Sequence, residues 1–395
     1  MVILNSDLNI STMDSTTLDP TTDVLRYPRA LKDLPELSRT SHTIVAVCLG
    51  IIFILGFLGN FCVLLVFARF HVLRTPINLI LLNICISDML VCIFGTPFSF
   101  AASIYGKWLI GLSGCKWYGF ANALFGIVSL VSFAILSLER YSTMLCYTTA
   151  DVSDYRKAWL SIAGCWLYSL AWTLPPLLGW SSYGPEGPGT TCSVQWHHRS
   201  PGNVSYVTCL FIFCLLLPLV LMIYCYGKIL IAIHGTARIN QTSAQRRETH
   251  VLLMVLSMVS CYLLCWMPYG VVSLLATFGR VGAIGPTASI IPSLLAKTST
   301  VLNPIVYVLF NNQFYRCFMA LVPCVPGNQS HNYLHTLQSS PALAGHPNSL
   351  PLSPLGALST PPDSPARLEE RPHIPAKDQL QRDKEALVLV VHYTP

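Results

Sequence analysis

Long apolar segments separated by short polar ones dominate the first 310 residues of this chain. Seven of these segments have roughly 20 residues or more, which is enough for an α-helix to cross the ~30 Å hydrocarbon core of a bilayer. Polar and apolar positions do not alternate strictly within them, which argues against membrane strands. The pattern predicts an all-α membrane protein, a bundle of seven helices near residues 43–68, 77–101, 112–138, 158–178, 204–233, 249–277 and 284–310.

The pattern changes on both sides of this bundle, 43–310. Residues 1–42 are polar and lack the apolar core of a cleavable signal peptide, so they predict an N-terminal tail. Residues 311–322 are amphipathic and predict a short helix along the membrane surface. Residues 323–395 are rich in Ser and Pro without helical period, which predicts a disordered tail rather than a second domain.

Composition and charge agree with a membrane protein. Hydrophobic residues make up 53% of the chain and charged residues only 11%, whereas soluble domains carry about 25% charged residues. Lys and Arg gather in the loops on one side of the predicted spans, and such loops are cytoplasmic. We therefore expect a multi-pass plasma-membrane protein with an extracellular N-terminus and a cytoplasmic C-terminus. The net charge of +6 reflects this topology, and a nucleic-acid partner is not expected.

Covalent modification is expected at five positions. Cys115, at the outer start of the third span, and Cys192, in the outer loop between spans four and five, both face the oxidising compartment and predict a disulfide. This bond would fold the loop over the bundle. Asn9 and Asn203 begin outward-facing Asn-X-Ser sequons and predict glycosylation. Cys324, just after the amphipathic segment, is a candidate for palmitoylation.

Lys297 is the only side chain in the seventh span that ordinarily carries a charge at neutral pH. A charged group at this depth of a bilayer costs about 2.5–3.5 kcal/mol on insertion scales. Such an amine is therefore paired, neutralised or covalently occupied. The alternative is an amine that reaches back to the headgroups, but Lys297 lies roughly three to four turns from either end of the span. The sequence favours a functional amine.

Three motifs lie on the spans in a specific order. They are Glu139-Arg140-Tyr141 at the end of the third span, Cys265-Trp266-Met267-Pro268-Tyr269 in the sixth and Asn303-Pro304-Ile305-Val306-Tyr307 late in the seventh. Each motif alone is weak evidence. The ordered set, with Asn60, Asp88, Trp166 and Pro218 in the four remaining spans, resembles the rhodopsin-like G-protein-coupled receptors.

A narrower resemblance comes from the segment around the buried lysine. Ala296-Lys297-Thr298-Ser299, shortly before Asn303-Pro304, is similar to the retinal attachment site of opsins, and other rhodopsin-like receptors lack this lysine. The resemblance covers residues 40–325 or so. Four further segments resemble the encephalopsin and teleost multiple-tissue opsin group: Leu73 to Pro76, Leu124 to Ser129, Leu167 to Trp172 and Leu177 to Trp180.

The receptor motifs predict an activation switch. We expect Arg140, flanked by Glu139 and Tyr141, to pair with Glu248 across the cytoplasmic ends of the helices and to release it on activation. The alternative is that these are ordinary boundary charges facing water. Prolines hinge the sixth and seventh helices, at Pro268 and at Pro304 beside Tyr307. Asp88 is expected to join a polar network with Asn60 and Asn303, the alternative being packing without a switching role.

A protonated retinal Schiff base at Lys297 requires a nearby anion. Tyr118 occupies the position where vertebrate visual opsins carry their glutamate counterion. The remaining acid on the outer side is Glu186, six residues before Cys192, which matches the second-loop glutamate of opsins. We expect Glu186, together with Tyr118, to be the counterion. The alternative is an exposed loop acid, the usual fate of a glutamate.

Five further residues are expected to line the retinal pocket. Trp266 lies mid-span, which excludes a role in the interfacial aromatic belt, and Tyr269 lies one turn further along the same helix. Both would pack against the polyene. Gly126 and Asn122, one turn apart on the third span, and Phe211 on the fifth are further candidates, and ordinary core packing is the alternative for Phe211.

The resemblance therefore implies a non-visual photoreceptor that is not an enzyme and holds no metal. It would bind 11-cis-retinal covalently and activate a heterotrimeric G protein of the inhibitory or transducin-like class, with arrestin and a receptor kinase as further partners. Reliance on the second-loop glutamate implies bistability. Two alternatives remain: a rhodopsin-like receptor for a diffusible ligand, or a retinal photoisomerase. A transporter or channel fits less well, because no span carries a ladder of polar residues.

Overall fold

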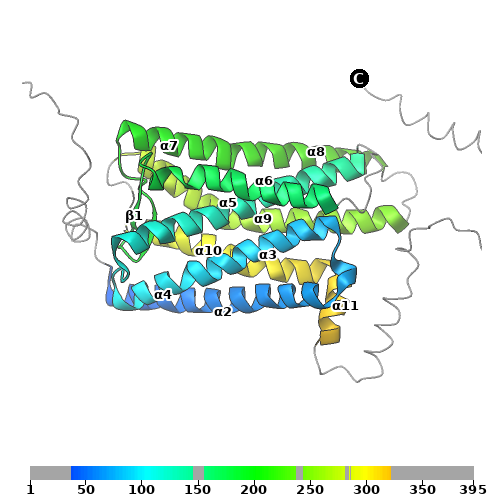
Figure 1. Ribbon diagram of the computed structural model, residues 1–395, viewed down its shortest axis with the longest axis horizontal. Coiled ribbons are helices and arrows are strands. Elements are labelled where there is room, and N and C mark those ends of the chain that lie inside the picture. Colours follow the sequence, from blue (N-terminus) through cyan, green and yellow to red (C-terminus); the bar gives the residue numbers. More distant parts are fainter. Residues whose placement is uncertain (1–36, 146–154, 237–242, 281–283, 285, 322–395) are drawn as a thin grey trace, which may run out of the picture. The chain divides into compact units, whose positions relative to one another are not determined.

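Seven helical segments run lengthwise beside one another in the computed structural model, which describes residues 37–145, 155–236, 243–280, 284 and 286–321 (Figure 1). The segments are α2 (Arg39–Arg69), α3 (Pro76–Phe94) with α4 (Thr96–Tyr105), α5 (Gly111–Leu145), α6 (Tyr155–Thr173), α7 (Pro201–Phe211) with α8 (Leu217–Thr236), α9 (Ser243–Phe278) and α10 (Pro286–Phe310). A further helix, α11 (Asn312–Leu321), follows α10 and turns away from the bundle at one end (Figure 1). The predicted seven-helix bundle is confirmed.

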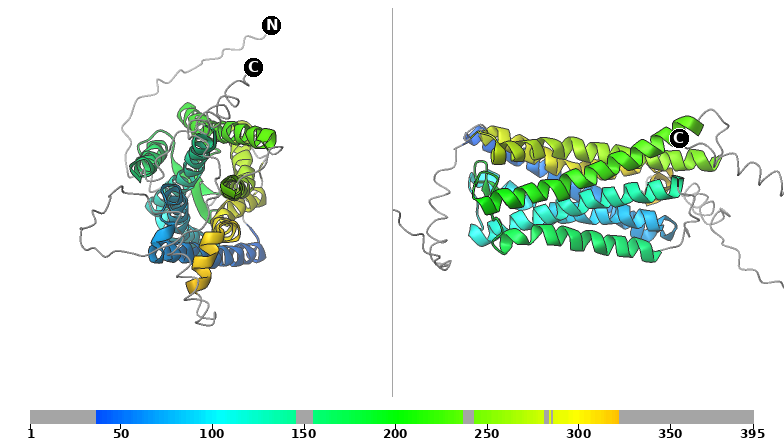
Figure 2. Two further views of the ribbon diagram at one scale, coloured as in Figure 1. Left: turned by 90° about the vertical axis from the view of Figure 1, so that its right-hand side faces the viewer. Right: turned by 90° about the horizontal axis from the view of Figure 1, so that it is seen from above.

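The third helical segment, α5, occupies the centre of the bundle. It packs against α3, α6, α8 and α9, whereas α9 and α10 form an extensive neighbouring pair and α2 covers α3, α4 and α10. The view along the bundle shows this arrangement in cross-section (Figure 2). Because α5 is surrounded, its side chains are placed to connect several helices at once.

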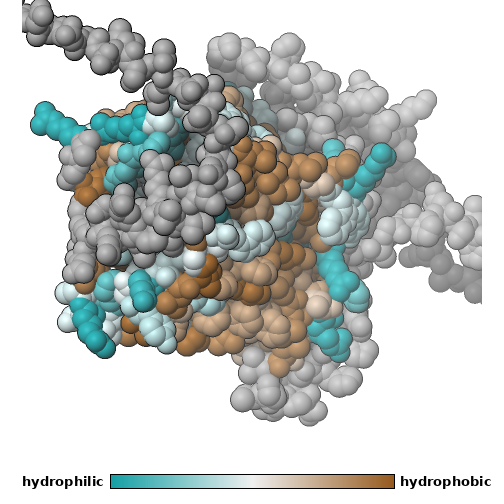
Figure 3. Space-filling view, turned by 60° about the vertical axis from the view of Figure 1, so that its left-hand side comes forward, coloured by the Kyte–Doolittle hydropathy of each residue, from teal (hydrophilic) through white to brown (hydrophobic). Residues whose placement is uncertain are grey.

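Apolar side chains also cover the outside of the bundle, as expected for a protein solvated by lipid. The outer face of α2 exposes a row of large aliphatic side chains, including Ile44, Val47, Ile51 and Leu58. In a space-filling view, hydrophobic residues gather over the middle of the face and hydrophilic ones toward its two ends (Figure 3). Within the described residues, six helical segments are long and apolar enough to cross a membrane. The remaining bundle helix, α6, is shorter, with 19 residues.

Several helices begin with the same local signal. Ser38, Thr75 and Ser200 precede α2, α3 and α7, and each accepts a hydrogen bond from a backbone N–H of the first turn. These caps satisfy donors that have no partner within the helix. Proline follows the cap in α3 and α7, where its fixed φ suits the first helical position and its missing N–H costs nothing.

The fourth span ends earlier than predicted. The sequence pattern suggested residues 158–178, but α6 ends at Thr173 and a short 3-10 turn, η2 (Pro175–Leu177), follows. Two consecutive prolines stop the helix, because neither supplies a backbone N–H and each clashes with the preceding turn. The apolar residues beyond them, which made the span look longer, lie in a loop where Leu178 is largely exposed.

The fifth span contains a wide turn that the hydropathy pattern did not predict. Between α7 and α8 lies a π-helical turn, η3 (Ile212–Leu216), and the N–H of Leu217 bonds to the carbonyl of Ile212. Pro218 follows at once and cannot donate to the helix. The extra residue in this turn changes which side chains of the fifth span face the bundle.

A two-stranded antiparallel hairpin caps one end of the bundle, hereafter the hairpin end. It consists of β1 (Tyr183–Glu186) and β2 (Thr191–Val194), with Glu186 opposite Thr191. A disulfide joins Cys192 of β2 to Cys115 of α5, as predicted. The hairpin lies so close to α5 that a Cβ on Gly119 would come within 2.8 Å of the Tyr183 ring.

The disulfide gives the first prediction. Replacing Cys192 with Ser should lower the free energy of unfolding by about 2–4 kcal/mol, because the bond closes a long loop in the unfolded chain. Thermal unfolding in detergent, followed by a thiol-reactive dye, measures the change. Cys115→Ser and the double variant should behave like Cys192→Ser, since each loses the same bond; a double variant much less stable than either single one would contradict this account.

Candidate functional site

Lys297 lies in the middle of α10, between two prolines inside that helix, Pro292 and Pro304. The side chain is half-buried, and its Nζ lies 5.5 Å from the centre of the Tyr118 ring on α5. The amine therefore points into the bundle and not toward lipid. A cation over an aromatic face is stabilised by the negative charge of the ring's π system.

A cavity of about 190 Å³ opens between α5, α7, α9, α10 and the hairpin. Its walls are mainly apolar and aromatic, with polar groups both at the hairpin end and deeper in the bundle. All eight residues that the sequence assigned to the chromophore and its surroundings line it: Lys297, Glu186, Tyr118, Trp266, Tyr269, Gly126, Asn122 and Phe211. These residues come from four helical segments and the hairpin.

Glu186, at the end of β1, lies buried beneath the hairpin with 9% of its surface exposed. Its Oε2 accepts a hydrogen bond of 3.2 Å from the Tyr269 hydroxyl. Burial raises the pKa of the Glu186 carboxyl above its usual range, while Ser193, Tyr269 and the positive charge of Lys297 act in the opposite direction. The alternative of an exposed loop acid is wrong, and the carboxylate needs a cation to remain charged here.

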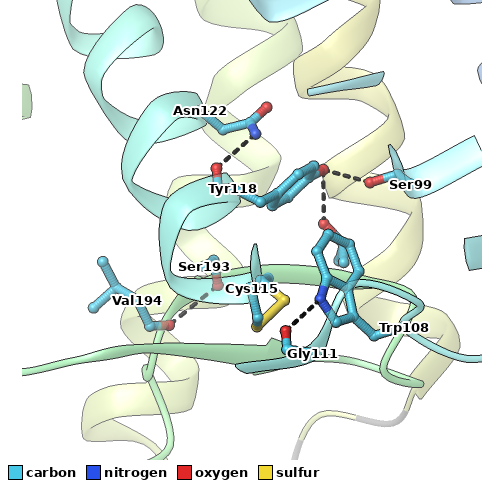
Figure 4. The surroundings of a disulfide bond; sticks show 10 residues. Ser99, Trp108, Gly111, Cys115, Tyr118, Asn122, Ser193 and Val194 are labelled. Carbon is cyan, nitrogen blue, oxygen red and sulfur yellow. Dashed lines mark hydrogen bonds between the residues drawn. A yellow bond between two sulfur atoms is a disulfide. The ribbon is translucent and has the colours of Figure 1, made fainter. Parts of the chain in front are cut away.

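Tyr118 contributes its ring to the amine and its hydroxyl to the surrounding structure. The hydroxyl is hydrogen-bonded to Ser99 of α4 and accepts a 3.1 Å hydrogen bond from Thr191 of β2. Figure 4 shows Tyr118 on α5, about one turn from the disulfide-bonded Cys115, with its hydroxyl directed to Ser99. Tyr118 thus joins three elements at the point where Lys297 approaches.

The far wall of the cavity depends on a close approach between α5 and α9. A Cβ on Gly126 would lie 2.9 Å from the Trp266 ring, so a larger residue there would displace the indole. Trp266 donates a 3.1 Å hydrogen bond to Ser299 of α10, two residues after Lys297. This hydrogen bond links Trp266 to the part of α10 that carries Lys297.

A polar cluster lies deeper in the bundle, where Asp88 also borders the cavity. The Asp88 carboxylate accepts hydrogen bonds from Asn303 (2.7 Å) and Ser129 (3.3 Å). The predicted partner Asn60 instead donates to the backbone carbonyl of Thr300. The network thus connects α3, α5 and α10 directly, and α2 through the backbone.

Comparisons with known proteins agree with this geometry. Residues 59–307 match the family described as 7 transmembrane receptor (rhodopsin family). Pinopsin of Columba livia is 38% identical over 79% of this chain and 88% of its own, and Opsin-3 of Mus musculus is 37% identical over 73% of each. The crystal structure of squid rhodopsin superposes with a TM-score of 0.69 and 25% identity, over 83% of this chain and 97% of that one.

The chain belongs to the opsins. The resemblance inferred from its motifs is confirmed at the level of the non-visual opsins, which are photoreceptors of the G-protein-coupled class and not enzymes. Its chromophore is a retinal.

The cavity of this opsin fits such a chromophore. An elongated polyene needs apolar and aromatic walls, which this cavity has, and the Lys297 amine lies in its wall. A buried acid lies along the same cavity.

The predicted switch at the other end of the opsin is described in part. Arg140 is buried on α5, and Tyr307 is buried on α10, where its ring packs against Phe314 of α11 at 4.7 Å. The side chain of Glu248 lies outside the described residues. The Arg140–Glu248 contact, and the switching roles of Glu139, Tyr141 and Pro304, therefore remain predictions.

The structure argues against one predicted modification. Asn203 lies in the first turn of α7 with 2% of its surface exposed, and its side-chain amide donates to the backbone carbonyls of Gln195 and His198. Its carbonyl oxygen accepts from Ser181. A glycan on this nitrogen would replace hydrogen bonds that hold the loop on the helix, which disfavours the predicted glycosylation at Asn203. Asn9 and Cys324 lie outside the described residues.

Sequence reasoning missed Trp196. This residue follows β2, is 8% exposed, and donates hydrogen bonds to Ser193 (3.0 Å) and to the Tyr269 hydroxyl (3.2 Å). Its place four residues after Cys192 could have suggested that it lies near the cavity, since the disulfide ties this strand to α5. Nothing in the sequence indicated that its partner is 73 residues away.

The second prediction concerns glycosylation at Asn203. Ser205→Ala removes the sequon but keeps the Asn203 side chain, and it should leave the mobility shift produced by an N-glycosidase unchanged. Asn203→Gln should also leave the shift unchanged, yet lower the yield of folded opsin, because each buried hydrogen bond that is lost costs about 1–3 kcal/mol. Asn9→Gln should abolish the shift. A shift that becomes smaller in Ser205→Ala would show a glycan on Asn203.

Proposed function

We propose that this opsin holds 11-cis-retinal as a Schiff base on the Lys297 amine, formed with the loss of water, and signals light to a heterotrimeric G protein. The observation that carries the proposal is that Lys297 and the buried Glu186 border one cavity with aromatic walls. When bound, retinal supplies the absorption of light and the cis–trans isomerisation. The chain supplies the charge, the walls and the response.

Glu186 and Tyr118 would stabilise a positive charge on the Lys297 nitrogen. A cation on the nitrogen of Lys297 would relieve the cost of burying the Glu186 carboxylate, and the carboxylate would in turn favour the protonated nitrogen. The Tyr118 ring already faces the amine and adds a cation–π contribution. The hydroxyl of Tyr118 is engaged by Ser99 and Thr191, so Glu186 would provide the compensating negative charge.

Signal transfer would begin at Trp266. This side chain is confined between Gly126 and Ser299, and α9 contains Pro268 two residues later, a residue type at which helices bend. Displacement of the indole would act on α10 near the Asn303–Asp88 hydrogen bond. A shift in this network would let α9 move away from Arg140, release Glu248, and open a groove for the G protein at the end opposite the hairpin.

The basic loops and the disulfide support one orientation of the opsin in the membrane. The basic loops lie at the end opposite the hairpin, which supports a cytoplasmic position for that end, and the disulfide supports an extracellular hairpin. We propose the plasma membrane as the location and the inhibitory or transducin-like class as the G protein. Arrestin and a receptor kinase would act on the cytoplasmic side.

The third prediction tests attachment and signalling together. Cells supplied with 11-cis-retinal should yield a pigment with a visible absorption band and a light-dependent change in cyclic-nucleotide level. Lys297→Ala should lose both, because no other amine borders the part of the cavity that the structure describes. Lys107→Ala, at an exposed lysine in a loop, is the matched control and should keep both.

Two further readouts belong to the same experiment. Borohydride reduction should place a retinyl group on the peptide that contains Lys297. A second flash, absorbed by the photoproduct, should restore the original spectrum if the pigment is bistable. A visible band in Lys297→Ala would overturn the attachment, whereas release of all-trans-retinal after one flash would overturn only bistability.

The fourth prediction concerns the counterion. In Glu186→Gln the protonated nitrogen loses its anion, so the pH at which half of the visible band has moved to the ultraviolet should fall by about 1–3 units. Glu186→Asp keeps an anion and should show a smaller change. Absorbance recorded in the dark across a pH series measures both; an unaltered midpoint in Glu186→Gln would remove Glu186 from this role.

A further inference from the structure

Three side chains at the hairpin end form a chain of hydrogen bonds that leads into the cavity. The Trp196 indole N–H donates to the Tyr269 hydroxyl at 3.2 Å, and this hydroxyl donates to Glu186 Oε2 at the same distance. The rings of Trp196 and Tyr269 also meet edge-on, with centroids 6.1 Å apart. The chain thus joins the loop after β2, helix α9 and the end of β1.

The direction of these hydrogen bonds is set by the chemistry of the indole. An indole nitrogen can donate but cannot accept. The phenol proton of Tyr269 therefore cannot turn toward Trp196, and it points to the carboxylate. Ser193, which also accepts from Trp196, directs its own proton to the backbone carbonyl of Val194. With the indole and the Ser193 hydroxyl directed in this way, the Tyr269 hydroxyl donates to Glu186.

A donor aimed at a carboxyl group favours its charged form. A hydroxyl in place of the indole could reverse, donating or accepting as the carboxyl gained or lost a proton. We propose that Trp196 is a positioning residue that keeps the Tyr269 hydroxyl donating to Glu186, and so keeps Glu186 anionic beneath the chromophore. The inference rests on the proposed role of Glu186 as counterion and adds the group that maintains its charge.

Other groups near Glu186 act beside this chain, and Ser193 of β2 also lowers the pKa of the Glu186 carboxyl. Lys297 acts from α10 as a positive charge, and its effect depends on its own protonation. Tyr118, on α5, has its hydroxyl engaged by Ser99 and Thr191. Tyr269 on α9 is the titratable group in direct contact, and its proton direction is what Trp196 determines.

The fifth prediction is tested with Trp196→Phe, which keeps an aromatic ring and removes the N–H. In the dark, the pH midpoint of the visible band should fall by about one unit, less than in Glu186→Gln. In the opsin without retinal, the infrared band of a protonated carboxyl, assigned by its absence in Glu186→Gln, should grow at neutral pH. In a Glu186→Gln background, Trp196→Phe should add no further change in the midpoint.

Trp180→Phe is the matched control. Trp180 lies earlier in the same loop, donates its N–H to Ser205 at 3.0 Å and packs against Tyr206, away from Glu186. The substitution makes the same chemical change and should leave the midpoint and the carboxyl band unaltered. If Trp196→Phe does not fold, Tyr269→Phe interrupts the chain one step further in and should lower the midpoint with the indole still present.

The outcomes separate the two proposals. Suppose that the midpoint falls in Glu186→Gln but stays unchanged in Trp196→Phe, or in Tyr269→Phe where Trp196→Phe does not fold. This result would overturn the role of Trp196 and leave Glu186 as the counterion. An equal effect of Trp180→Phe would also overturn it, since the change would then be a general property of the loop. An unchanged midpoint in Glu186→Gln would overturn both proposals.

Discussion

The bond between Cys115 and Cys192 holds the hairpin against the central helix, and the arrangement around the cavity depends on it. Cys192 is one residue from Thr191, whose strand partner is Glu186 and whose hydroxyl bonds Tyr118. The disulfide therefore holds Thr191 in a position that serves both residues: it pairs with the buried Glu186 and bonds the Tyr118 hydroxyl. Tyr183, anchored by its hydroxyl to the carbonyl of Thr173, holds the other strand on α6.

Inside the spans, polar side chains have no water with which to form hydrogen bonds. A hydroxyl or amide at bilayer depth must find its partner within the protein, because lipid offers none. Helix α10 satisfies this requirement within itself, because the hydroxyls of Thr298, Ser299 and Thr300 donate to backbone carbonyls three or four residues earlier. These internal bonds surround Lys297 with satisfied groups and leave its amine to face the Tyr118 ring. The low polarity of these surroundings makes each remaining charge effective over a long distance.

The same cavity touches both functional regions of the opsin. Glu186 borders it at the hairpin end and Asp88 borders it deeper in the bundle, with Trp266 between α5 and α10. A change of shape inside this cavity can therefore reach the polar network without passing through a separate channel or domain. The π-helical turn of the fifth span lies on its wall through Cys214 and Leu215, and regular helix geometry is already interrupted there.

Much of the fold could be predicted because hydropathy is a local property with a large signal. Twenty apolar residues in a row identify a span wherever it packs, and the ordered motifs identified the helices that carry Lys297 and Arg140. The same signal overestimated the fourth span at Pro175, because apolar loop residues after a helix stop look like more helix. It also gave no indication of the π-helical turn, since one extra residue per turn leaves the composition unchanged.

By itself, the sequence determined the number of spans, the buried amine, the cysteine pair and the acid six residues before Cys192. Only the tertiary structure decided that Glu186 is buried, that the Asn203 amide donates to backbone carbonyls, and that Trp196 bonds a tyrosine 73 residues away. The reason is physical: apolar length and residue type act along the chain, whereas burial and the direction of a hydrogen bond depend on which distant surfaces meet.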